Sequence, residues 1–235
     1  MNATLVRAFL RQRLTSPMRV GLLLLVTVAP LAAVALMGTL SPLGGVATPI
    51  ALIFAVGAIG QDVSSGTLQL LLVRPVSRPS YLVSRWLACV LATVGIVVLL
   101  LALGTLVLLA RGTHPDGLDL VRIVLESAST AAGYAAVMIM LSTLANGLGD
   151  LGLYVGTYFI VQALDALATF KHWDALARAC VEVRGALGPQ LPWEWLVHGT
   201  PPSWFAFASW ASTVTLALAV GIARLNRREL SYAAG

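Results

Sequence analysis

Long uncharged stretches alternate with short polar segments along this chain. No charged residue occurs between Arg19 and Asp62, and none between Arg85 and Arg111. A stretch of about 20 apolar residues can cross the hydrocarbon core of a bilayer as a helix. The pattern therefore predicts an all-α membrane protein. Its six expected transmembrane helices cover residues 20–39, 46–61, 84–110, 121–145, 151–169 and 203–223.

Turn-forming residues separate the expected spans. The first uncharged stretch is too long for one helix, and Pro42 with the Gly44-Gly45 pair predicts a tight turn near its middle. Residues 170–202 differ from the rest of the chain, because they carry both signs of charge, four prolines and three tryptophans. We expect them to form an outer segment between spans five and six.

The first 18 residues predict a separate element, an interfacial helix over residues 1–18. One apolar stripe at helical spacing consists of Leu5, Val6, Phe9, Leu10 and Leu14. Arg7 and Arg11 lie one turn apart on another face. A helix of this kind lies in the membrane interface, where its arginines reach anionic headgroups; an ordinary solvated helix is the alternative. Pro17 marks the bend into the first span.

Composition supports the membrane interpretation. Of the 235 residues, 58% are hydrophobic and 11% are charged, whereas a soluble domain carries about 25% charged residues. The excess of 15 Lys and Arg over 10 Asp and Glu would suggest nucleic-acid binding in a soluble protein. In a membrane protein the same excess belongs to cytoplasmic loops, so we expect no nucleic-acid partner.

The positions of the cations predict the orientation. Six spans place both termini on one side of the membrane. With the N-terminus inside, the cytoplasmic segments hold ten of the 15 cations, namely Arg7, Arg11, Arg13, Arg19, Arg74, Arg78, Arg85, Arg224, Arg227 and Arg228. Because short cytoplasmic loops are enriched in Lys and Arg, both termini are expected in the cytoplasm.

The loop between spans two and three, residues 62–80, has an unusual pattern for a connector. Residues 68–72 form an apolar ridge within a loop that also carries Asp62 and Arg78. Pro75 ends the short helix that this ridge predicts. An apolar ridge in a polar loop requires burial, so it contacts either a protein partner or the membrane surface.

The same loop resembles the coupling region of the ABC-2 class of ABC transporter permeases. In that family an acidic residue precedes Gly-Thr-Leu-Glu-Leu-Leu, then Pro-Val-Ser-Arg follows, and a Gly-Lys pair enters the third span. Gln69 stands here in place of the Glu and cannot form an ion pair, while Ser84-Arg85 replaces Gly-Lys. The resemblance assigns ATPase coupling to Asp62, Gly66, Thr67, Leu68, Gln69, Leu70, Leu71, Leu72, Arg74, Pro75, Ser77 and Arg78.

The resemblance also implies an architecture and a function. Residues 1–235 would form a single transmembrane domain, with a cytosolic coupling helix in the loop and short outer helices between spans five and six. The chain would be the permease subunit of an exporter in the plasma membrane of a prokaryote, surrounded by membrane lipids. Two cytosolic ATPase subunits would bind ATP and Mg and move the loop, with Asp62, Arg74 and Arg78 at the rim of the contact. A second permease copy, identical or paralogous, would complete the pathway.

The nearly uncharged spans favour a lipid-like or hydrophobic compound as the exported substrate. Alternatives are a heme-exporter-type or copper-maturation-type permease subunit, and a membrane anchor that transports nothing. An enzyme is not expected, because a phosphate-binding loop needs Gly-x-x-x-x-Gly-Lys-Ser/Thr and the one lysine, Lys171, stands in Ala-Thr-Phe-Lys-His-Trp. We therefore assign ATP hydrolysis to a partner and expect no cofactor in this chain.

Two pairs of residues in span five are weaker candidates for a pathway or dimer contact. Gly152 and Gly156 are spaced for close helix approach, either between two chains or inside one bundle. Gln162 and Asp165 lie near the outer end of this span, where they either line a wet pathway or cap the helix.

Metal-ligating side chains are few. Those expected on the outer side are His114, His172, His198 and Cys180. No two of them stand at a local ligand spacing, so we expect no metal site and assign no role to the three histidines.

Overall fold

The computed structural model is built from helices. It describes residues 3–65, 77–145, 147–191, 193, 195–199 and 203–227, and within these residues it contains no strand. The helices in chain order are α1 (Ala3–Leu14), α2 (Pro17–Met37), η1 (Ser41–Leu43), α3 (Ala47–Ala55), α4 (Gly60–Ser64), α6 (Arg78–Ala110), α7 (Gly117–Leu144), α8 (Gly149–Lys171), α9 (Asp174–Leu187), α10 (Trp195–His198) and α11 (Trp204–Arg227).

Six segments of the described chain are long and apolar enough to cross a membrane: α2, the η1–α3–α4 unit, α6, α7, α8 and α11. The predicted all-α class with six spans is therefore confirmed, although the ends differ. α6 begins at Arg78 rather than at residue 84, because the Ser77 hydroxyl caps the amide of Ser80 and Pro79 fits the first helical turn. The 33 residues of α6 span about 50 Å. This exceeds the hydrocarbon core of about 30 Å, so α6 extends beyond the membrane.

The second span is not the continuous helix predicted over residues 46–61. The short helix η1 leads into α3, which ends at Ala55, and α4 begins only at Gly60. Between them, Gly57 has a φ of 66°, a left-handed conformation that interrupts an α-helix. The hydropathy pattern hides this break, because every residue from 50 to 59 is hydrophobic or glycine.

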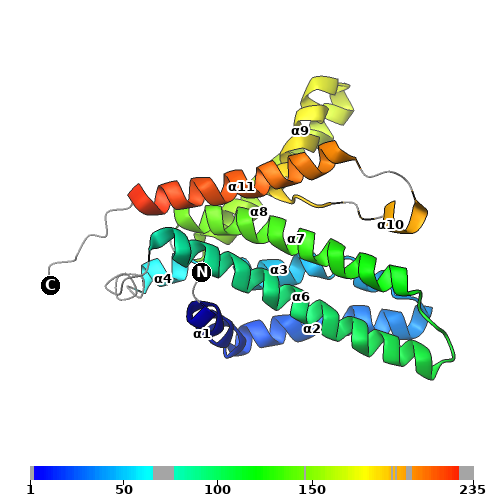
Figure 1. The fold of residues 1–235 in the computed structure, drawn as a ribbon. Helices are drawn as coiled ribbons and strands as arrows, with labels where there is room; N and C mark the ends of the chain where they lie inside the picture. The colour runs from blue at the N-terminus through cyan, green and yellow to red at the C-terminus, as the bar shows by residue number, and fades with distance from the viewer. Residues whose placement is uncertain are drawn as a thin grey trace.

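α7 forms the centre of the bundle, with α3, α6 and α11 packed around it (Figure 1). In its most apolar 18-residue window 72% of the residues are buried, against 11% in α2 and 17% in both α8 and α11. Residues 127–136 of α7 are mostly Ser, Thr, Ala and Gly, and small residues let membrane helices approach closely. The peripheral helices α2 and α8 keep large apolar side chains such as Leu36 and Phe159 exposed.

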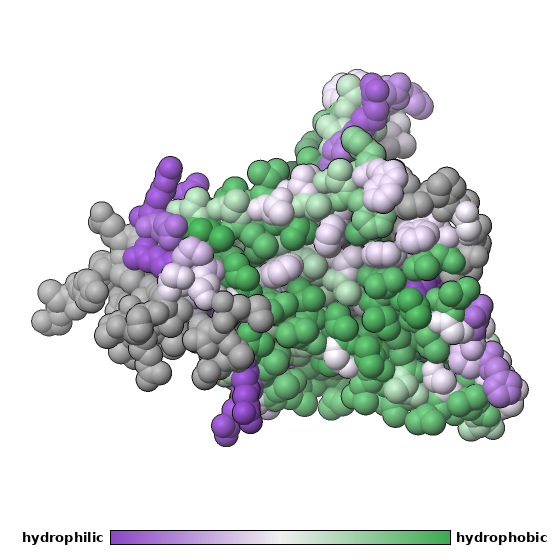
Figure 2. Space-filling view, viewed as in Figure 1, coloured by the Kyte–Doolittle hydropathy of each residue, from purple (hydrophilic) through white to green (hydrophobic). Residues whose placement is uncertain are grey.

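The surface of the molecule matches a membrane environment. Figure 2 shows hydrophobic side chains across the middle of the bundle and hydrophilic ones toward its two ends and on α9. A soluble monomer rarely exposes so continuous an apolar surface. The protein is therefore a multi-pass membrane protein.

α1 confirms the helix predicted within residues 1–18, and it packs against α6. Phe9 is buried and Arg7 and Arg11 are exposed, as the amphipathic pattern predicts. Leu14, expected in the apolar stripe, is instead 49% exposed, whereas Arg13 is buried. Arg13 is buried because its side chain donates a hydrogen bond to the carbonyl of Val56 inside the bundle.

Two helices lie in the described part of the predicted outer segment. α9 folds back against α8, and the short α10 precedes α11. α4, the N-terminal helix and the last turn of α11 lie toward the same end of the bundle (Figure 1). This arrangement is what an even number of spans requires.

Candidate functional site

Side chains from α7 and α8 hold the break in the second span. At this point the amides of Gly57, Ile59 and Gly60 donate to side chains and not to carbonyls of the helix. Asp150 Oδ2 accepts a hydrogen bond from the Gly57 amide at 2.6 Å, and Ser142 Oγ accepts from the amides of Ile59 at 3.0 Å and Gly60 at 2.8 Å. Asp150 and Ser142 are both fully buried. They satisfy backbone groups for which the bilayer offers no partner.

The turn between α7 and α8 packs directly on this break. The Gly147 amide donates to the carbonyl of Gly60 at 2.9 Å. A methyl group built on Gly60 would lie only 2.6 Å from the carbonyl oxygen of Gly147. Glycine at position 60 therefore permits the two backbone segments to touch.

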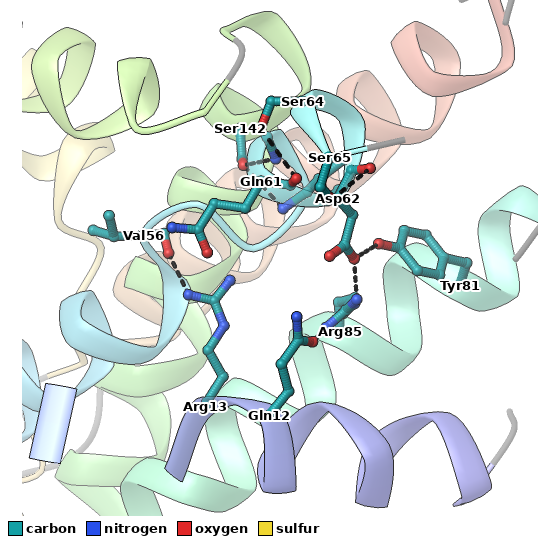
Figure 3. A network of polar contacts seen from close by, with 12 residues as sticks. Gln12, Arg13, Val56, Gln61, Asp62, Ser64, Ser65, Tyr81, Arg85 and Ser142 are labelled. Atoms are coloured by element: carbon teal, nitrogen blue, oxygen red, sulfur yellow. Dashed lines mark hydrogen bonds and ion pairs between the residues drawn. The ribbon is translucent and has the colours of Figure 1, made fainter. Parts of the chain in front are cut away.

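Two arginines from the N-terminal part of the chain hold the break from the other side. Arg13 of α1 donates to the carbonyl of Val56 at 2.7 Å (Figure 3), and Arg19 of α2 donates to Gln61 Oε1 at 2.8 Å. Burial, together with the neighbouring charge of Arg19, lowers the pKa of Arg13 to about 10. Arg13 is therefore still cationic at neutral pH, where it completes the C-terminal end of α3.

An ion pair closes the base of the 62–80 loop. Asp62 of α4 is 4% exposed. Its carboxylate accepts a hydrogen bond from the Tyr81 hydroxyl at 2.5 Å and forms an ion pair with Arg85, and both partners lie on α6 (Figure 3). The Arg85 guanidinium also lies 4.3 Å from the centroid of the Phe9 ring, which adds a cation–π contact with α1. The residues that enter and leave the loop are thus bound to each other.

These contacts form one polar network. Its members are Gln12, Arg13, Arg19, Val56, Gln61, Asp62, Tyr81, Arg85, Ser142 and Asp150. It joins α1, α2, α4, α6, α7 and α8 around the break. Within the described chain, no three His, Cys, Asp or Glu side chains gather so that they could hold a metal ion.

The structure describes the ends of the predicted coupling segment and not its centre. The residues that lie outside the described part are Gly66, Thr67, Leu68, Gln69, Leu70, Leu71, Leu72, Arg74 and Pro75. Ser77 caps the start of α6. Asp62 does not lie at a surface rim, because its buried carboxylate is held within the chain; its part in ATPase coupling stays a prediction.

Arg78 is also engaged inside the chain. Its Nη1 donates to the carbonyls of Leu225 and Asn226, at 2.8 and 2.9 Å. These carbonyls belong to the last turn of α11, where a helix has unpaired acceptors and the negative end of its dipole. Arg78 therefore connects the far end of the loop to the last span, a role that the sequence analysis did not anticipate.

The weaker candidates in α8 have two different surroundings. A methyl group built on Gly152 or Gly156 would meet no described atom within 4 Å. These glycines therefore do not serve a close helix contact within the described part of one chain, and a dimer or pathway contact stays a prediction. Asp165 forms an ion pair with Arg184 of α9 at 2.7 Å, and Gln162 accepts from the same guanidinium at 3.3 Å. These two residues hold α9 against α8.

Of the polar network, the sequence analysis assigned a coupling role only to Asp62. The side chains that meet the backbone of the break, Arg13, Ser142 and Asp150, were not among its candidates. Two glycines inside an apolar span, Gly57 and Gly60, indicate a backbone irregularity. A polar residue near the membrane boundary then becomes a candidate to satisfy the freed amides. Together these signals could have pointed to the network, although the sequence cannot say which polar residue meets which amide.

Replacing Gly57 by Ala should lower the melting temperature of the purified protein. Alanine is strained at a φ of 66° by about 1–3 kcal/mol. Its methyl group would also lie 2.9 Å from the side chain of Gln61, which Arg19 holds in place. The matched control is Gly21→Ala in α2, where a methyl group meets nothing within 4 Å. Equal melting temperatures for the two variants would contradict the importance of the break.

The fold and the network define a polytopic helical membrane protein with a braced cluster at one end. The sequence was compared with models of known families, and the model described as ABC-2 family transporter protein matches residues 18–178, more than half of the chain. The chain therefore belongs to the ABC-2 transporter family and is a membrane-spanning permease component of an ABC transporter. A comparison with curated proteins found no match. The family predicted from the 62–80 loop is thus confirmed.

Proposed function

We propose that this chain is the permease subunit of an ABC exporter and that its 62–80 loop couples it to a cytosolic ATPase. Membership of the ABC-2 family associates the chain with ABC ATPases. The observation that carries the proposal is the closed base of the loop, where Asp62 is bonded to Tyr81 and Arg85. A segment anchored in this way moves as one body with α4 and α6 when a partner displaces it.

In this proposal the apolar ridge of residues 68–72 docks in a groove of the ATPase, which binds ATP and Mg. When the two ATPases bind ATP and close, they displace the loop. The displacement passes through α4 to the break and thus to α7 and α8, and through Arg85 to α1. Arg78 passes it to α11. Because these helices respond together, the pathway between two permease copies opens alternately to each side.

The proposed substrate is a lipid-like or hydrophobic compound. The support is that charged residues are rare within the six spans: the paired Asp62 and Arg85, for example, lie at one end of the bundle and are neutralised by each other. Stimulation of ATP hydrolysis by such a compound in the reconstituted complex would support export. Hydrolysis that no compound changes would favour the alternative of a membrane anchor without transport.

The intact complex should contain two permease chains and two ATPases. One bundle offers only half of a pathway, and the exposed faces of α2 and α8 are available for a second copy, with Gly152 and Gly156 on the α8 face. Native mass spectrometry of the complex released from membranes measures this composition. A one-to-one complex that still transports would contradict the proposal.

Both termini and the 62–80 loop should lie in the cytoplasm. The test uses two exposed positions at opposite ends of the bundle, Thr113→Cys and Ser64→Cys. The native cysteines, Cys89 and Cys180, are both buried and give a low background. A membrane-impermeant maleimide added to intact cells should label the variant at Thr113 and spare that at Ser64. The reverse labelling would invert the topology.

A further inference from the structure

A cavity of about 380 Å³ lies between the start of α2, the end of α3 and the start of α8. Its apolar wall includes Leu22, Leu52, Ile53 and Leu151. Leu22 and Leu151 are each 39% exposed, so the cavity opens onto the surface of this chain. Its size falls in the range of cavities that bind small organic ligands, about 300–1,000 Å³.

The polar part of this cavity is cationic. Arg19 and Gln61 line it, and no described Asp or Glu does. Arg19 is half-buried and donates to the neutral amide of Gln61; among the described residues it forms no ion pair. A partly buried guanidinium without a carboxylate is stabilised by an anionic ligand.

Two neighbouring features strengthen the same preference. Arg13 lies close enough for its charge to act on Arg19, so the cluster beside the cavity holds two cations. Ser16 and Met18 also line the cavity, and they stand at the start of α2, where no side chain caps the helix. The positive end of the α2 dipole therefore adds to the attraction for an anion.

We propose that this cavity binds an anionic phospholipid from the leaflet at the α4 end of the bundle. The phosphate lies at Arg19, and one acyl chain follows the wall formed by Leu22, Leu52 and Leu151. A wholly polar anion would leave this wall unfilled, and an uncharged lipid would leave Arg19 unpaired. The site is independent of the compound that the transporter carries.

The site would also give the lipid access to the break in the second span. Val56, whose carbonyl accepts the hydrogen bond from Arg13, lines the cavity. Gln61, the residue that Arg19 holds, belongs to α4, next to Asp62. A bound lipid therefore packs against the same backbone that the polar network braces, and it stabilises the arrangement seen here.

The test is titration of the delipidated, purified full-length chain with three probes, followed by native mass spectrometry. The probes are dioleoyl phosphatidylglycerol, dioleoyl phosphatidylcholine and inorganic phosphate. We expect one tightly bound phosphatidylglycerol per chain and no displacement of the lipid by inorganic phosphate. Phosphatidylcholine should bind about tenfold more weakly, because it has the same phosphate but its choline group places a further cation beside Arg19 and Arg13. Equal affinity for the two lipids would overturn the proposal, and displacement by phosphate alone would reduce the site to an ion site.

Two pairs of variants locate the site. Arg19→Gln should weaken phosphatidylglycerol binding about tenfold, whereas Arg11→Gln, at an exposed cation of α1, should not. Leu151→Trp should fill the cavity and expel the lipid while Arg19 stays in place; the matched control is Leu153→Trp, which is 44% exposed and does not line the cavity. The melting temperature shows that each variant is folded. Unchanged lipid binding in both Arg19→Gln and Leu151→Trp would refute the site.

Discussion

The double variant Leu70→Asp, Leu71→Asp should no longer bind the ATPase subunit. Burial of each leucine in the proposed groove contributes about 1.5–3 kcal/mol, so removal of two weakens the contact roughly 100-fold or more. Each aspartate would in addition enter an apolar groove without a partner. Detergent extraction followed by a pull-down on the permease measures the bound ATPase, and ATP turnover is then measured on the recovered complex.

A matched control separates lost contact from added charge. Ser64→Asp with Ser65→Asp places the same two charges at exposed positions just before the apolar ridge of residues 68–72 and removes no leucine. This control should retain its ATPase. The alternative, in which residues 68–72 lie on the membrane surface, predicts that the Leu70 and Leu71 variant also retains it.

The single variant Arg85→Gln should strongly destabilise the permease, by about 3–5 kcal/mol. It would leave the carboxylate of Asp62, which is 4% exposed, without its cationic partner. Asp62→Asn should also lower the stability, because it would leave the guanidinium of Arg85 without its anionic partner. The double variant Asp62→Asn, Arg85→Gln should lose less free energy of unfolding than the two single variants together, because it contains no unpaired buried charge. Unfolding followed in detergent gives the free energies.

The ion pair of Asp119 and Arg122 serves as the control for this cycle. It joins residues three apart in α7 at 3.6 Å, with side chains 44% and 25% exposed. Because exposed pairs contribute at most about 1 kcal/mol, Arg122→Gln should change the stability little. If Arg85→Gln is equally mild, the polar network does not brace the loop as described.

The six spans could be predicted from the sequence because membrane insertion depends on hydropathy over about 20 residues, a property of local sequence. The break at Gly57 could not be predicted in the same way. Its amides are satisfied by Ser142 and Asp150, which lie 82 to 93 residues further along the chain. Nothing in the hydropathy pattern distinguishes this interrupted span from a continuous helix.

The candidate site shows a similar division. The 62–80 loop was found from its leucines and prolines, because its pattern is contiguous. Asp62 was expected at the rim of a protein contact and Arg13 was counted only as a cytoplasmic cation, since a charged residue near a membrane boundary is usually solvated. Arg85 and Val56, respectively, supply partners that make burial favourable. Such pairings depend on how α1, α4 and α6 meet, which the sequence alone does not specify.

The central claim is that the segment between Asp62 and Arg78 docks on an ATPase. The most direct measurement places the photoreactive amino acid p-benzoylphenylalanine at Gln69 in the full-length chain, in intact cells. Irradiation followed by mass spectrometry of the adduct identifies the neighbour of this side chain. The account predicts an adduct with an ABC ATPase that carries a phosphate-binding loop, and loss of this adduct in the Leu70→Asp, Leu71→Asp background. Adducts with lipid alone would contradict it.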